Sequence, residues 1–145
     1  MLTHHLLASA GKSVALAGNI GSSFAKAVTT SSPDYWVLEL SSFQLDGIQK
    51  FRPHIAVLTN ITPDHLDRYD YKFEHYIASK FRIVMNQTKE DYLIYDADDD
   101  VINTYIQSHQ IQSTLVPFSL TKILAQGAYL KQKEIIIKFK KEEKI

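Results

Sequence analysis

The sequence contains no cysteine, which excludes both a disulfide framework and a thiolate metal site. This absence is compatible with a reducing compartment, and we expect a cytoplasmic protein. Neither sign of charge is in excess, because 16 basic residues balance 16 acidic ones. This balance of charge provides no net electrostatic attraction to nucleic acid or to an anionic membrane. No apolar run is long enough to span a bilayer, and the first ten residues lack the charged start of a signal peptide.

What is present predicts an α/β fold with a mostly parallel sheet flanked by helices. Short apolar, β-favouring runs alternate with helical patterns along the 145 residues. The run at 55–59 is nearly all apolar, so we expect that strand to be central in the sheet. Near the end, residues 128–131 and 134–139 predict a C-terminal β-hairpin that adds antiparallel pairing at one edge. The other expected elements are helices at 2–10, 22–28, 73–85 and 101–108, and strands at 14–17, 35–37, 92–95 and 115–118.

Three apparent motifs are set aside on physical grounds. His4 and His5 are adjacent in a predicted helix, so they point to different faces and do not form a metal site. The run Gly11-Lys12-Ser13 is not a phosphate loop, because Leu6 stands where that motif needs a glycine and a helix precedes it. The acidic residues at 96–100 are consecutive and splay apart, so they predict a turn and the charged start of a helix.

Polar side chains follow several of the predicted strands, and ligands collect at the carboxyl ends of strands in parallel sheets. Glu39 stands at the end of the second strand, where a buried carboxylate needs a partner or a metal. Asn19 lies between Gly18 and Gly21, in a turn that either is simply tight or lets a ligand approach the backbone. His65 lies in the polar run that follows the strand at 55–59.

Four segments resemble the Mur ligases, in particular those that add D-glutamate to UDP-N-acetylmuramoyl-L-alanine. Glu39-Leu40-Ser41-Ser42-Phe43-Gln44-Leu45 is similar to the segment around that family's metal-binding Glu. Gly18-Asn19-Ile20-Gly21 and the Thr-Asn to Asp-His-Leu-Asp run at 59–67 follow the family's pattern. Ala78-Ser79-Lys80-Phe81-Arg82-Ile83 matches the context of an N-carboxylated lysine. The likeness covers residues 2–99 well and the remainder loosely.

This resemblance implies a site for Mg²⁺ formed by Glu39, His65 and Lys80. Glu39 would be a metal ligand, His65 would serve a second metal, and Lys80, as a carbamate anion, would fix the geometry of metal and phosphate. His65 and Lys80 are thus expected to take part in catalysis, while Asn19 and Ser41 bind substrate and orient the reacting groups. Mg²⁺ prefers oxygen ligands, so action of His65 through water or the substrate stays open. Plainer interpretations also stay open: a solvated Lys80, and a Ser41 hydroxyl that caps the next helical turn.

The resemblance further implies an enzyme of peptidoglycan precursor synthesis. ATP, the co-substrate, would phosphorylate the carboxylate of UDP-N-acetylmuramoyl-L-alanine, and the amine of D-glutamate would attack the acyl phosphate, with Mg²⁺ neutralising charge. We expect residues 1–145 to be part of the central ATP-binding domain of such a ligase, without its phosphate loop and its N-terminal and C-terminal domains. The isolated chain is therefore expected to be inactive.

Two alternative functions remain. The chain could come from another Mur-type ligase or from a folylpolyglutamate synthase, although the residues after Glu39 argue against both. It could also be a non-catalytic α/β binding or scaffolding domain that retains these motifs. A Mg²⁺ titration separates the enzyme from the scaffold, and the oligomeric state is not predicted.

Overall fold

The computed structural model describes residues 1–139. The predicted solvated charge run at 138–144 lies mostly outside these described residues. The chain divides into two compact units, Met1–Leu45 and Asp46–Ile145. Within the described part, no helix is both long enough and apolar enough to cross a membrane.

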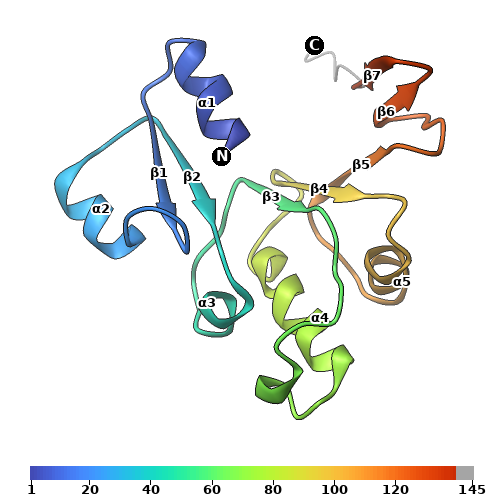
Figure 1. Cartoon of the computed structure of the whole chain (residues 1–145), viewed down its shortest axis with the longest axis horizontal. Helices are drawn as coiled ribbons and strands as arrows, with labels where there is room; N and C mark the ends of the chain where they lie inside the picture. The colour runs from blue at the N-terminus through green and yellow to red at the C-terminus, as the bar shows by residue number, and fades with distance from the viewer. Residues whose placement is uncertain (140–145) are drawn as a thin grey trace. The chain divides into compact units, whose positions relative to one another are not determined.

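Unit 1 consists of a pair of parallel strands with two helices (Figure 1). The strands pair in register from Val14 opposite Tyr35 to Gly18 opposite Glu39, so both strands end at the same edge. Phe24 meets Trp36 edge-on, with ring centroids 5.2 Å apart, and this contact packs the second helix on the sheet. In chain order the elements are α1 (Leu2–Ser9), β1 (Val14–Gly18), α2 (Phe24–Thr30) and β2 (Tyr35–Glu39), followed by α3 (Ser42–Asp46).

Unit 2 contains a five-stranded sheet in the order β3-β4-β5-β6-β7. The first four strands are mutually parallel, whereas β6 and β7 form an antiparallel hairpin. The predicted α/β fold, with a mostly parallel sheet and a C-terminal hairpin, is therefore confirmed. The elements are β3 (Ile55–Leu58), η1 (Leu66–Arg68), α4 (Phe73–Phe81), η2 (Arg82–Val84), β4 (Tyr92–Asp96), α5 (Asp100–Ser108), β5 (Thr114–Ser119), β6 (Gly127–Lys131) and β7 (Glu134–Lys138).

The predicted central position of the strand at 55–59 is wrong. In its sheet β3 is an edge strand, and Ile55 and Val57 are 54% and 49% exposed, whereas Ala56 and Leu58 are buried. Only one face of this strand is covered within its unit. An unbroken apolar run therefore did not distinguish a strand covered on both faces from an edge strand covered on one.

The other edge of the sheet is β7, which also presents apolar side chains to solvent. Ile135 and Ile137 are 75% and 63% exposed, and both lie on one face of the hairpin because they pair with Leu130 and Ala128. Glu134 and Lys138 stand at the two ends of the strand.

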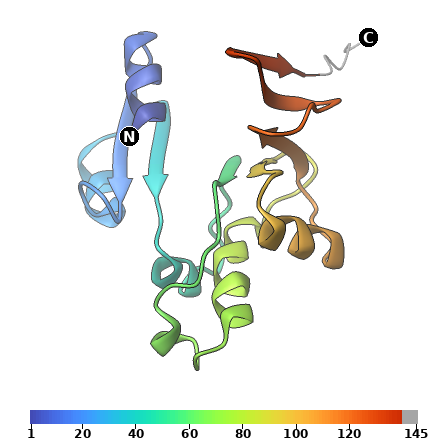
Figure 2. The same cartoon turned by 45° about the vertical axis from the view of Figure 1, so that its right-hand side comes forward.

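The core of unit 2 lies between the sheet and helices α4 and α5, which cover the same face of it (Figures 1 and 2). Leu93, in the second strand of the sheet, and Ile102, in α5, are both completely buried. Tyr76 and Phe81 of α4 complete this cluster from the other helix. Burial of these side chains is the main force that holds the helices on the sheet.

Two carboxylates accept hydrogen bonds that stabilise the loops at opposite ends of the strands. Asp91, just before β4, is 2% exposed and accepts hydrogen bonds from Arg52 Nε (2.7 Å) and the Thr88 N–H (2.7 Å). These donors hold the pKa of Asp91 well below its usual range. Asp98, just after β4, accepts from Thr121 Oγ1 (2.7 Å), Ser119 Oγ (2.8 Å) and two backbone N–H groups.

We expect acid to destabilise unit 2 through Asp98. Hydrogen bonding, from Thr121 first, lowers its pKa to about 2, below the value of about 3.9 for an unfolded aspartate. A depressed pKa contributes stability that is complete above about pH 4 and is lost as the pH falls towards 2. Urea midpoints measured from pH 5 to pH 2 should therefore fall less steeply in Asp98→Asn than in the wild type. The exposed control Glu134→Gln should follow the wild-type slope, and an unchanged slope in Asp98→Asn would contradict this account.

Candidate functional site

The carboxyl ends of β1 and β2 bring Asn19 and Glu39 together. The Asn19 N–H donates to the Glu39 carbonyl at 2.7 Å, directly after the Gly18–Glu39 pair that closes the sheet. Gly18 has φ of 117°, and a Cβ there would overlap the Glu39 carbonyl oxygen. Glycine is therefore required for this close approach of the two strands.

The Glu39 side chain meets the chemical requirement of a cation ligand. Its Oε2 atom is buried and has no hydrogen-bond partner among the described residues. A carboxylate oxygen removed from water without a donor is costly, and a metal ion or a ligand donor removes that cost. Because Mg²⁺ prefers carboxylate oxygen, Glu39 fits this ion.

Ser41 caps α3 through a reciprocal pair of hydrogen bonds. The Ser41 N–H donates to Gln44 Oε1 at 2.9 Å, and the Gln44 N–H donates to Ser41 Oγ at 3.4 Å. This is the capping-box arrangement for a serine followed three residues later by glutamine. The capping interpretation of Ser41 is confirmed, and its role in binding substrate stays a prediction.

His65 stands at the start of η1 in a left-handed conformation, with φ of 49°. Its N–H donates to Asp64 Oδ1 at 2.8 Å, and its Nε2 lies 3.5 Å from Asp64 Oδ2. The imidazole is about half exposed. Positive φ is unfavourable for a residue with a Cβ, and such strain clusters at binding and catalytic positions.

Hydrogen bonds hold the segment around His65 in place on both sides of this residue. Before it, the buried Ile61 donates its N–H to Asp99 Oδ2 at 3.0 Å. After it, Tyr69 Oη donates to Asp46 Oδ2 at 3.0 Å and lies 3.2 Å from Ser79 Oγ on α4. These bonds fix the loop against the helices of unit 2.

Lys80 lies in the last turn of α4 and is half-buried. Its Nζ is 5.4 Å from the centroid of the Tyr76 ring, whose edge-to-face partner is Tyr69. No acidic side chain in the described part of the chain forms an ion pair with Lys80. As an ammonium Lys80 repels a metal cation, whereas as a carbamate it would supply the oxygen ligands that Mg²⁺ takes.

The predicted site residues are divided between the two units. Asn19, Glu39 and Ser41 belong to unit 1, and His65 and Lys80 belong to unit 2. Within residues 1–139, no group of three or more His, Asp or Glu side chains is arranged to hold a metal ion. Mg²⁺ often takes only one or two carboxylates and completes its shell with water and phosphate oxygens. The metal set of Glu39, His65 and Lys80 therefore stays a prediction.

Comparison with known proteins identifies the family. The model of the Mur ligase middle domain matches residues 1–145. The chain belongs to this family.

Relatives of this Mur ligase middle domain are named UDP-N-acetylmuramoylalanine–D-glutamate ligase. Those of Christiangramia forsetii, Cytophaga hutchinsonii and Bacteroides fragilis are 57%, 53% and 51% identical to it. Each match covers 94% of this chain and 30–31% of the relative. The chain thus spans about a third of the length of the curated relatives it matches.

Two residues of this Mur ligase domain make contacts that were not predicted from the sequence. Gln44 completes the cap with Ser41, and its signal, serine followed three residues later by glutamine, was present in the sequence. Asp99 caps α5, as an aspartate before a helix predicts, but its second bond reaches Ile61, 38 residues away. No local pattern indicates such a contact.

Proposed function

We propose that this domain is part of an ATP-dependent ligase that joins D-glutamate to UDP-N-acetylmuramoyl-L-alanine in the cytoplasm. The observation that carries the proposal is the 51–57% identity to relatives named for that ligation. The buried, unpartnered Oε2 of Glu39 supports it, because it is a ligand position for a cation at the carboxyl edge of a parallel sheet. Residues 1–145 are then part of the central domain.

The reaction divides into two displacements. A carboxylate oxygen of the alanyl group attacks the γ-phosphorus of ATP, the bond from phosphorus to the bridging oxygen breaks, and ADP leaves. The amine of D-glutamate then attacks the acyl phosphate, loses a proton, and displaces inorganic phosphate as the amide forms. Mg²⁺ would supply charge neutralisation at the phosphate and carboxylate oxygens.

The residues of this chain would bind and orient these groups. Glu39 would hold the cation with its buried oxygen, and Asn19, whose backbone is fixed to the end of β2, would face the same edge. His65 would serve a second cation either directly or through water. Lys80 would act as a carbamate, and Ser41 would present its hydroxyl to the substrate while its N–H holds the helix cap.

The test is ligation by the complete protein that carries this sequence, with ATP, MgCl₂, UDP-N-acetylmuramoyl-L-alanine and D-glutamate. We expect product, ADP and phosphate in equal amounts. Glu39→Gln, which keeps the shape but removes the charge, should lower kcat/KM at least about 100-fold. The control Glu90→Gln changes a glutamate whose side chain is 76% exposed and should leave kcat/KM unchanged.

Other outcomes separate the alternatives. Ligation of another amino acid in place of D-glutamate would indicate a different Mur-type ligase or a folylpolyglutamate synthase. No turnover, together with Mg²⁺ binding that Glu39→Gln does not change, would favour a non-catalytic domain.

A further inference from the structure

The carboxylate of Asp99 bonds two segments that are distant in the sequence. Its Oδ1 accepts the Ile102 N–H of α5 at 2.9 Å, and its Oδ2 accepts the Ile61 N–H at 3.0 Å. Asn103 Nδ2 donates to the carbonyl oxygens of Asp99 (2.7 Å) and Ala97 (3.0 Å), which fixes the backbone around the carboxylate. Asp99 is therefore a rigid acceptor with both oxygens in use.

The Ile61 end of this link leads directly to His65. Ile61 is 2% exposed, and only three residues separate it from His65. A buried N–H that loses its acceptor is costly, so without Asp99 this part of the loop is driven to open towards water. Since His65 already adopts a positive φ, its position depends on contacts that hold the loop in place.

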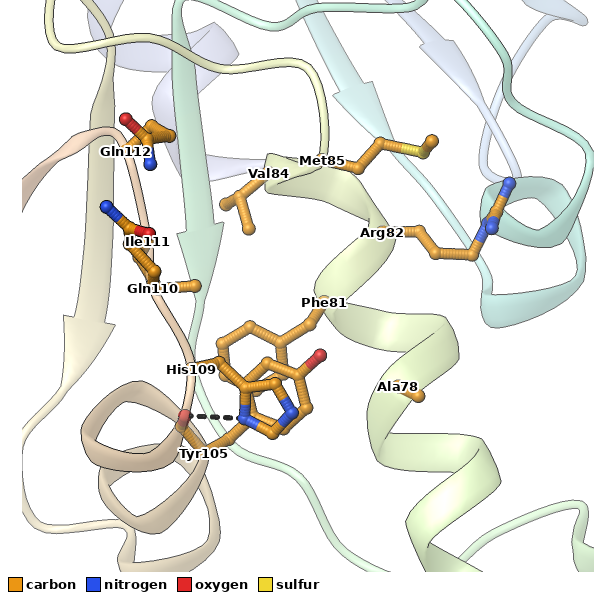
Figure 3. A pocket seen from close by; sticks show the side chains of 10 residues that line it. All are labelled: Ala78, Phe81, Arg82, Val84, Met85, Tyr105, His109, Gln110, Ile111 and Gln112. Atoms are coloured by element: carbon orange, nitrogen blue, oxygen red, sulfur yellow. Dashed lines mark hydrogen bonds between the residues drawn. The ribbon is translucent and has the colours of Figure 1, made fainter.

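Near its C-terminal end, α5 packs against α4, the helix that carries Lys80. Tyr105 stacks on Phe81 with ring centroids 3.8 Å apart and planes 13° from parallel, and His109 stacks on the outer face of Tyr105 (Figure 3). A ring nitrogen of His109, Nδ1, also lies 3.1 Å from the Tyr105 carbonyl oxygen (Figure 3). Phe81 directly follows Lys80 in the chain. Helix α5 thus fixes the spacing between the His65 loop and the Lys80 helix within unit 2.

We propose that Asp99 is a positioning residue that holds the His65 loop in the geometry needed for Mg²⁺. The proposal rests on the proposed function for the identity of the ion. Asp99 acts on this loop through its bond to the backbone N–H of Ile61.

The test is Asp99→Asn, which keeps the size of the side chain but has a single acceptor oxygen, so that either the Ile61 or the Ile102 N–H loses its acceptor. In the 145-residue chain we expect hydrogen exchange of the Ile61 amide to become about tenfold faster. In a titration of the complete protein with MgCl₂, we expect the apparent affinity to fall about tenfold, with a rise in the KM for Mg²⁺. Asp100→Asn is the matched control, because it removes the same charge from the neighbouring exposed position.

The outcomes are distinct. Faster Ile61 exchange together with weaker Mg²⁺ binding, both absent in Asp100→Asn, supports the proposal. Unchanged Ile61 exchange in both Asp99→Asn and Asp99→Ser, or faster exchange with normal Mg²⁺ affinity, overturns it. If Asp99→Asn folds poorly, Asp99→Ser keeps the helix cap and removes only the link to Ile61. If Asp99→Asn has both effects but the wild type ligates nothing, the proposed function fails and the link stands.

Discussion

Replacing Gly18 by alanine is expected to destabilise unit 1 by about 3 kcal/mol or more, a large part of the stability of a small domain. Two costs combine. The residue has φ of 117°, where a side chain is strained, and the new Cβ would overlap the backbone carbonyl oxygen of Glu39. The strands must separate at the edge that holds Asn19 and Glu39, so the close approach of these two residues is lost together with the stability.

The single tryptophan makes this effect measurable, because Trp36 lies in β2 of unit 1. The urea midpoint followed by Trp36 fluorescence should fall sharply in Gly18→Ala. Gly11→Ala is the matched control: Gly11 also has positive φ, 72°, but no atom lies within 4 Å of its would-be Cβ. It should cost only the conformational strain, about 1 kcal/mol. Equal midpoints for the two variants would mean that the overlap at Gly18 is relieved without cost.

The second large effect is expected in unit 2, where Leu93→Ala should cost about 3 kcal/mol and lower Tm by roughly 10–20 °C. Leu93 is completely buried in β4, between the neighbouring strands and under both helices. Truncation removes apolar contacts and leaves a cavity that the regular sheet cannot fill by collapse.

Thermal unfolding followed by far-UV circular dichroism measures this change. Leu120→Ala removes the same atoms from a side chain that is 70% exposed, and its Tm should stay within about 3 °C of the wild type. A loss of Tm in Leu93→Ala no larger than in Leu120→Ala would show that the core lies elsewhere.

The sequence predicted most elements to within one or two residues, because their apolar periodicity is produced by the same burial that stabilises them. The expected strand at 14–17 is β1, Val14–Gly18, and the helix expected at 73–85 is α4 followed by the turn η2. The edge position of β3 was not predictable, since burial on one face or on two gives the same four apolar letters. The sequence of a single strand does not show whether a neighbouring strand lies on one side of it or on both.

For the candidate site, the local contacts were predictable and the distant ones were not. Ser41 caps its helix as expected, because its partner is three residues away. The Asp99–Ile61 bond joins residues 38 apart, and the buried Oε2 of Glu39 is a property of the fold around it. The roles of Lys80 and His65 came from the family resemblance and not from their surroundings.

The outer edge of β7 has a consequence for handling the protein. Within residues 1–139, no strand pairs with the outer edge of β7, and an unpaired strand with exposed isoleucines is a template on which further chains can add. Glu134 and Lys138 stand at its two ends as gatekeepers, because stacking such strands in parallel register brings like charges together. Salt that screens Glu134 and Lys138 is therefore expected to favour addition of chains at this edge and to shorten the storage life of concentrated preparations.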